Sequence, residues 1–374
     1  MKRISTPIII ILAVLTLVVV EGSQLSAQDR PLVQMAILLD TSSSMDGLID
    51  QAKSQLWKIV NELALSKKNG QSPKLEVALY EYGKSSLPRG EGYIRMIVPL
   101  STDLDRVSEE LFKLTTNGGD EYCGAVIESA TSGLKWSTNN KDLKVIFIAG
   151  NEPFTQGEVD YRKAVRAAIK RGIIVNTIYC GNADEGIRTN WKDGADLADG
   201  KYMNIDQDIK TVYIKAPQDE EIARLGQALN KTYIAYGAAG SAMKERQKKQ
   251  DMNAAGMSEE SVIQRSIAKA SRQYNNASWD LADAARDGKV DVDKLKDEEL
   301  PPEMKKMNKA ERKAYIEKRT KERAEIQKKI QILQEQRRAY IEQEQKKNAK
   351  ANTLDAVVIK AVRDQAVKKD FRFE

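Results

Sequence analysis

Three oxygen-bearing side chains follow one another at alternate positions near the start of the chain. The segment Asp40-Thr41-Ser42-Ser43-Ser44 supplies one carboxylate and two hydroxyl groups, those of Asp40, Ser42 and Ser44. Side chains spaced in this way can turn into one concavity, and their oxygens are ligands that Mg2+ accepts while it keeps several waters. The motif therefore predicts a divalent-cation site. The alternative is a turn whose Asp and Ser residues only cap the helix that follows.

The segments on either side of this motif favour the cation site. Residues 32–39 form an apolar run typical of a buried strand, and residues 49–63 carry apolar side chains at intervals of three and four, as in an amphipathic helix. The motif is therefore expected at the carboxyl end of a strand. Open α/β sheets bind their ligands at that edge.

The composition excludes most catalytic alternatives. The chain has 374 residues with no histidine and two cysteines, which excludes His-based acid–base chemistry, His-activated nucleophiles and His-ligated metals. No phosphate-binding Gly-Lys-Ser/Thr loop is present either. Cys123 and Cys180 are expected at the same edge of the sheet, where they form a disulfide or remain two buried free thiols. We therefore expect a protein that is not an enzyme.

Strand-like and helix-like periods alternate between about residues 32 and 237. The runs expected as strands are 32–39, 75–82, 94–100, 143–149, 173–180 and 202–205. The segments expected as helices are 49–63, 102–114, 124–134, 159–171, 188–198 and 219–229. Such alternation predicts an α/β fold, a doubly wound and mostly parallel sheet with helices on both faces.

With this context, the chain resembles the von Willebrand factor type A family. The resemblance covers roughly residues 32–237 and depends on Asp40-x-Ser42-x-Ser44 after the first strand, on the alternation that follows, and on the similarity of residues 201–205 to the last strand of the family. It implies a metal-ion-dependent adhesion site that holds Mg2+ or Mn2+. In that family the ion keeps an open position, which an acidic side chain of a partner protein fills.

The second and third loops of that site depart from the family pattern. Where the family has a Thr after a Gly pair, this chain has Asp120 and Glu121, and one or the other is expected as a direct ligand. Where the family has an Asp after the fourth strand, this chain has Gly150, and Asn151 or Glu152 is expected to reach the site instead. The alternative is a degenerate site that binds no metal.

The C-terminal part of the chain has a different character. Residues 241–374 contain 32 Lys and Arg against 24 Asp and Glu, which gives +8, whereas the first 240 residues contain 28 against 30, which gives −2. Charges of alternating sign and few aromatic residues make nucleic acid an unlikely partner. We expect a polar helical linker region over 241–307 and a charged helical tail over 308–374. Ile326, Ile330, Leu333 and Tyr340 fall on heptad spacing, which indicates either a short coiled coil or a lone charged helix.

The first residues match a secretory signal. Lys2 and Arg3 precede the apolar run 8–20, and the small residues Ser26 and Ala27 offer a cleavage site before Gln28. A signal peptide is therefore expected over 1–27, with an uncleaved membrane anchor as the alternative. The type A domain is then expected over 28–240, in an exported protein that is periplasmic, associated with the cell envelope, or secreted.

Together these features predict a non-enzymatic adhesion-type module that binds an acidic group of a partner protein through a divalent cation. The alternative is a metal-free scaffold whose basic helical tail oligomerises or associates with the cell envelope. Salt-sensitive binding by the tail would favour the scaffold, whereas chelator-sensitive binding by the type A domain would favour the cation site.

Overall fold

Six strands form one sheet in the order β4-β3-β1-β5-β6-β7, and only β4 runs antiparallel to its neighbour. The computed structural model describes residues 30–45, 48–205, 213–347 and 354–373. The strands are β1 (Leu32–Asp40), β3 (Lys74–Tyr82), β4 (Ile94–Ser101), β5 (Leu143–Gly150), β6 (Ile173–Cys180) and β7 (Tyr202–Ile205). The predicted doubly wound, mostly parallel sheet is confirmed.

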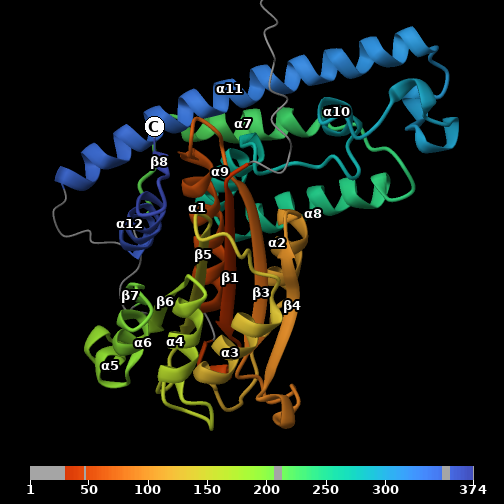
Figure 1. The fold of residues 1–374 in the computed structure, drawn as a ribbon. Helices are drawn as coiled ribbons and strands as arrows, with labels where there is room; N and C mark the ends of the chain where they lie inside the picture. Colours follow the sequence, from red (N-terminus) through yellow and green to blue (C-terminus); the bar gives the residue numbers. More distant parts are fainter. Residues whose placement is uncertain (1–29, 46–47, 206–212, 348–353, 374) are drawn as a thin grey trace, which may run out of the picture. The chain divides into compact units, whose positions relative to one another are not determined.

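Helices cover both faces of this sheet (Figure 1). One face packs against α1 (Leu48–Leu65), α2 (Leu104–Lys113) and α12 (Leu354–Val367). The other face packs against α3 (Cys123–Gly133), α4 (Tyr161–Lys170) and α6 (Trp191–Asp196), and the short α5 (Ala183–Arg188) precedes α6. The central strands are mostly apolar and are buried along almost their whole length, because their alternate side chains enter two different cores.

The register of the sheet places the first residues of the loops after β1, β3 and β5 side by side at the carboxyl edge. Asp40 at the end of β1 pairs with Tyr82 at the end of β3, and Leu39 pairs with Ala149 of β5. The loop after β1 contains a short 3-10 turn, Ser43–Met45, whose Met45 is buried in the core. This register gives the predicted motif its position at the ligand-binding edge.

The described part of the C-terminal region is mainly helical, with loops between its helices. Its helices are α7 (Asp219–Asn230), α8 (Gly240–Met257), α9 (Glu259–Ala270), α10 (Leu281–Arg286) and α11 (Lys309–Lys347). Within the expected helical linker region, the chain is not helical between α9 and α10, where Trp279 is buried and the Asp280 side chain accepts a hydrogen bond from the backbone N–H of Asp283. Similarly, the helix expected over 188–198 is divided between α5 and α6.

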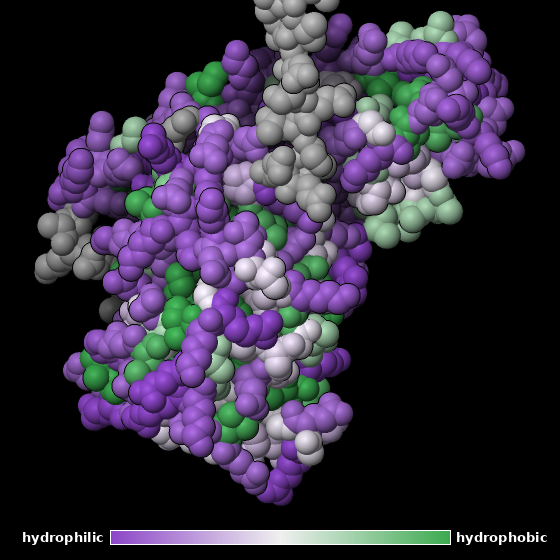
Figure 2. Space-filling view, viewed as in Figure 1, coloured by the Kyte–Doolittle hydropathy of each residue, from purple (hydrophilic) through white to green (hydrophobic). Residues whose placement is uncertain are grey.

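Helix α11 is not a lone solvated helix. Its buried residues Ile316, Arg323, Ile330 and Arg337 recur every seven positions and face the helices of the same chain. Ile330 joins the apolar cluster formed by α7 and α9, and the partly buried Ile326 and Leu333 pack against it. The heptad stripe that suggested a coiled coil therefore serves intramolecular packing. On the face seen in Figure 2, the side chains that α11 presents are mainly hydrophilic.

Buried ion pairs attach the helices of this region to one another. Arg323 of α11 pairs with Asp280 at 2.6 Å and with Asp283 at 2.8 Å, and Arg337 pairs with Asp219 of α7 at 2.6 Å. All five side chains are less than a tenth exposed. Removing one member of such a pair leaves a buried charge without compensation, so these contacts strongly constrain how α11 can pack.

The last residues complete the core of the sheet. Val358, Ala361, Val362 and Ala366 of α12 lie in the same apolar cluster as β1 and α1, and Phe371 is 1% exposed. The short strand β8 (Arg372–Phe373) pairs antiparallel with β2 (Ser66–Lys67), which follows α1. Residues 31–374 consequently form one compact unit. Among the residues that the structure describes, no helix has the length and apolar character needed to cross a membrane.

Replacing Phe371 by Ala should destabilise the whole unit, because it removes a fully buried aromatic ring from the main core. We expect the free energy of unfolding to fall by about 3 kcal/mol, as measured by urea denaturation. Val367→Ala is the matched control: its side chain is 57% exposed, so a change below about 0.5 kcal/mol is expected. Equal effects of the two substitutions would contradict a structural role for the C-terminus.

Candidate functional site

Asp40, Ser42 and Ser44 lie together at the carboxyl end of β1. The Asp40 Oδ1 atom accepts a hydrogen bond of 2.7 Å from the Ser42 backbone N–H, and the Ser42 and Ser44 hydroxyl oxygens are 2.8 Å apart. Asp40 and Ser42 are buried, whereas Ser44 is exposed. The tight turn after the strand therefore gathers three oxygen ligands in a small concavity that is open to solvent at Ser44.

Glu121 brings a second carboxyl group to this cluster from the loop before α3. It is 3% exposed, and both Asp40 Oδ1 and Glu121 Cγ lie within 3 Å of the place that a Cβ atom on Gly83 would take, so the two acids are neighbours. Its backbone N–H donates to Gln156 Oε1 at 2.7 Å, which fixes the loop. The structure thus places Glu121, one of the two acids expected from the second loop, beside Asp40.

The other expected acids lie outside this cluster of oxygens. Asp120 is exposed, and its carboxylate accepts a hydrogen bond of 3.1 Å from the Tyr122 hydroxyl. Glu152 is half-buried, and its charge contributes to raising the pKa values of Asp40 and Glu121. The hydrogen bond found for Glu152 in the described structure uses its backbone carbonyl, which accepts from Trp191 Nε1 at 2.8 Å.

Asn151 reaches the motif from the third loop. Ser44 donates a hydrogen bond of 3.0 Å to Asn151 Oδ1. The preceding residue, Gly150, has no room for a side chain: a Cβ atom there would lie 2.5 Å from the Tyr82 hydroxyl and 3.2 Å from Asp40 Cβ. The Tyr82 hydroxyl itself donates to the Ala149 carbonyl at 3.0 Å. Tyr82 therefore occupies space that a third-loop acid would need.

Gly83 allows the two carboxyl groups to meet, and sequence reasoning did not identify it. Its φ of +78° lies in the left-handed region, and a Cβ atom there would be 2.7 Å from Asp40 Oδ1 and 2.8 Å from Glu121 Cγ. The only sequence signal was a glycine directly after a strand, which ordinarily marks a turn. Its close approach to two acids depends on the tertiary structure.

Burial controls the protonation of the carboxyl pair. It raises the pKa of Asp40, and burial together with the hydrogen bond to Asp40 raises the pKa of Glu121 from 4.5 to about 10. Asp40 Oδ2 and Glu121 Oε2 are buried and have no hydrogen-bond partner among the residues that the structure describes. Two adjacent buried carboxyl groups cannot both be charged without compensation, so they share either a proton or a cation.

The residues present suit a hard divalent cation whose ligands include hydroxyl oxygens as well as carboxylates. Within the described ranges, no set of three or more Cys, Asp or Glu side chains is arranged to hold a metal. An ion at this edge would therefore use the carboxylates of Asp40 and Glu121, the hydroxyls of Ser42 and Ser44, and waters. An all-oxygen set of this kind fits Mg2+ or Mn2+ better than softer metals, and the two buried carboxylate oxygens without partners are free to bind it.

The two cysteines are free and buried, which contradicts the expected disulfide and agrees with the alternative. Cys123 lies in the apolar cluster on one face of the sheet and Cys180 in the cluster on the other face, so the strands separate them. Burial raises the pKa of both thiols. They therefore stay protonated near neutral pH and are poor nucleophiles.

Part of the chain matches a known protein family. Residues 34–188 match the model of the von Willebrand factor type A domain. Among solved structures, the SpRpn10 VWA domain is 18% identical, covers 47% of this chain and 88% of its own, and has a TM-score of 0.36. BatB from Bacteroides thetaiotaomicron is 15% identical, covers 59% of this chain and 99% of its own, and also has a TM-score of 0.36.

A third solved structure is the pilus adhesin SpaC from Lactobacillus rhamnosus GG, in an open conformation. It is 15% identical, covers 48% of this chain and 28% of its own, and has a TM-score of 0.36. None of the curated proteins matches the chain.

Glu121→Gln should change how stability depends on pH when divalent cations are absent. The folded chain retains the Glu121 proton that the unfolded chain releases. This contribution to stability is therefore complete below about pH 4.5 and is lost as the pH rises toward about 10. An amide does not titrate, so the variant lacks this contribution. Between about pH 5 and pH 9, the free energy of unfolding should therefore fall by about 1–3 kcal/mol less in the variant than in the unmodified chain, measured by urea denaturation in EDTA.

The exposed neighbour provides the control for this measurement. Asp120→Asn removes a carboxylate outside the buried pair and should leave the pH dependence as in the unmodified chain. If Glu121→Gln also leaves that dependence unchanged, the assignment of a shared proton to the carboxyl pair is wrong.

Proposed function

Because residues 34–188 form a von Willebrand factor type A domain, which is a protein-interaction and adhesion module, we propose that this chain binds a partner protein through a divalent cation. Asp40, Ser42, Ser44 and Glu121 would hold the ion, and an acidic side chain of the partner would complete its coordination. The chain would act as a binding protein rather than as an enzyme.

The observation that supports this proposal is the buried contact between Asp40 and Glu121. Each of these groups has an oxygen without a hydrogen-bond donor, and both lie beside two serine hydroxyls. The exposure of Ser44 leaves one side of the cluster accessible from solvent. A cation bound there would have protein ligands on one side and waters on the other, and a carboxylate of the partner can replace a water.

Two further features bear on where this protein would act and on which surface it would use. The expected signal at 1–27 lies outside the described residues and remains a prediction, and it would deliver the domain to the periplasm, the cell envelope or the medium. The helical C-terminal region packs near the amino ends of the strands: Gln273 donates to the Pro73 carbonyl before β3, and Lys369 donates to the Asn140 carbonyl before β5. The proposed cation site occupies the opposite edge of the sheet.

Calorimetric titration of residues 31–374 with Mg2+ and with Mn2+ tests the proposal. We expect a dissociation constant between about 1 μM and 1 mM, because only two carboxylates bind the ion directly. Asp40→Asn keeps the shape of the side chain but removes its charge and should abolish the heat of binding. Asp120→Asn is the matched control and should bind the ion with unchanged affinity.

The opposite result has a clear meaning. If the unmodified unit gives no heat and no thermal shift with either ion, the motif only caps the helix, and the adhesion mechanism is wrong. If Asp120→Asn abolishes binding and Asp40→Asn does not, the ion lies elsewhere on this edge.

A further inference from the structure

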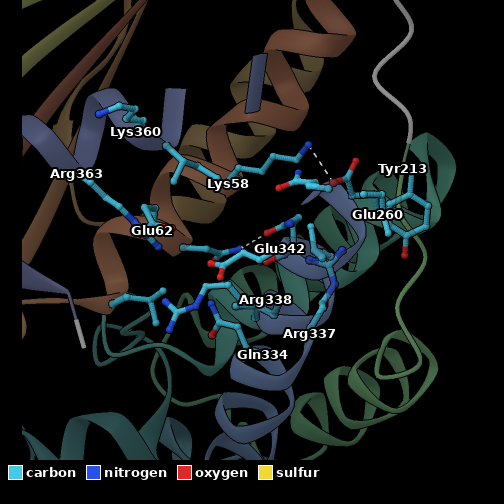
Figure 3. A pocket seen from close by; sticks show the side chains of 18 of the residues that line it. Lys58, Glu62, Tyr213, Glu260, Gln334, Arg337, Arg338, Glu342, Lys360 and Arg363 are labelled. Carbon is cyan, nitrogen blue, oxygen red and sulfur yellow. Dashed lines mark hydrogen bonds and ion pairs between the residues drawn. The ribbon is translucent and has the colours of Figure 1, made fainter. Parts of the chain in front are cut away.

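A pocket of about 370 Å3 lies between four helices that are far apart in the sequence. Its walls come from α1, α9, α11 and α12, together with Tyr213 and Ile214 before α7. Figure 3 shows Gln334, Arg338 and Glu342 of α11 across the pocket from Lys58 and Glu62 of α1. Pockets of this size commonly hold small ligands.

The charged side chains that line the pocket are mostly paired with one another or with a neighbour. Lys58 pairs with Glu260 at 2.9 Å, Lys360 pairs with Asp364 at 2.9 Å, and Arg363 pairs with Glu62. Arg337 pairs with Asp219 behind the wall at 2.6 Å. These contacts account for four of the five basic and three of the four acidic residues in the lining.

Arg338 and Glu342 are the remaining charges, and within the described part of the chain neither has an ion-pair partner. They lie one turn apart on α11, where side chains share a face, yet they do not form an ion pair with each other. Arg338 is half-buried and Glu342 is exposed. The pocket thus offers one cationic and one anionic group to an occupant.

The rest of the lining is apolar or neutral. Leu65, Ile267, Ile341 and Ile359 come from the four different helices, and Ile214 completes an aliphatic wall. A ligand that satisfies the pocket must therefore carry one negative charge, one positive charge and aliphatic bulk. Multiply charged phosphate compounds do not fit this balance, because only one cation of the lining lacks a partner.

We propose that this pocket binds a short zwitterionic peptide with aliphatic side chains, of about dipeptide size. Its terminal carboxylate pairs with the Arg338 guanidinium, which can donate two parallel hydrogen bonds. Its terminal ammonium pairs with the Glu342 carboxylate, and its side chains contact the isoleucines of the wall. This site is separate from the proposed cation site, because its lining includes none of Asp40, Ser42, Ser44 or Glu121.

Calorimetry with leucyl-leucine and two modified forms tests the proposal on residues 31–374. We expect saturable binding of leucyl-leucine. N-acetyl-leucyl-leucine lacks the ammonium and leucyl-leucine amide lacks the carboxylate, so each should bind about tenfold more weakly. No saturable heat with leucyl-leucine up to about 10 mM would overturn the proposal. Tighter binding of the acetylated form would also overturn it, because the pocket would then select a simple anion.

Two variants assign each charge of the peptide to its residue. In Arg338→Gln the preference for the free carboxylate over the amide should disappear, and in Glu342→Gln the preference for the free ammonium over the acetylated form should disappear. Lys318→Gln, an exposed position on α11 outside the pocket, is the matched control and should keep both preferences. Circular dichroism verifies that each variant is folded. Preferences that persist in both pocket variants would place the peptide elsewhere.

Discussion

A parallel sheet that is buried on both faces needs helices on both faces, and the rest of this structure depends on that constraint. The side chains of β1 alternate between two apolar clusters, one completed by α1, α2 and α12 and the other by α3, α4 and α6. Because β1, β3 and β5 run parallel, the loops that follow them converge at the same edge of the sheet. The candidate site results from this convergence.

Two acidic side chains lie close together in the site, and two glycines make room for this arrangement. Gly83 lets Asp40 and Glu121 come together, and Gly150 leaves room for the Tyr82 hydroxyl. The resulting pair has buried oxygens without donors. Burial raises the pKa of both carboxyl groups, which favours a proton on the pair, and under the proposed function a cation would replace that proton. Occupancy by metal would accordingly depend on pH, because the ion and the proton compete for the same oxygens.

The local pattern of the sequence was sufficient to predict the strands of the sheet and part of the site. The six apolar runs became the six strands, because a strand buried on both faces is visible as a continuous apolar segment. Asp40, Ser42 and Ser44 could be selected by their spacing alone. Glu121 could be chosen only as one of two acids, because the packing of Gln156 against its backbone was not visible in the sequence.

The C-terminal region was less predictable because its charges pair over long distances. Asp219 begins the acidic run Asp219-Glu220-Glu221, yet it is fully buried and pairs with Arg337, 118 positions later. Hydrophobic periodicity within one segment cannot reveal such an ion pair, because each charged partner taken alone is typical of a surface residue.

Helix α12 and strand β8 complete the core, so the protein can finish folding only when both are present. Lys68 donates to the carbonyl of Lys369, 301 positions later, and Phe371 fills the same core as residues near the first strand. Contacts of such long range make folding slow. During synthesis the sheet can therefore reach its final stability only after residues 354–373 have left the ribosome, so the core stays incomplete while they are being made.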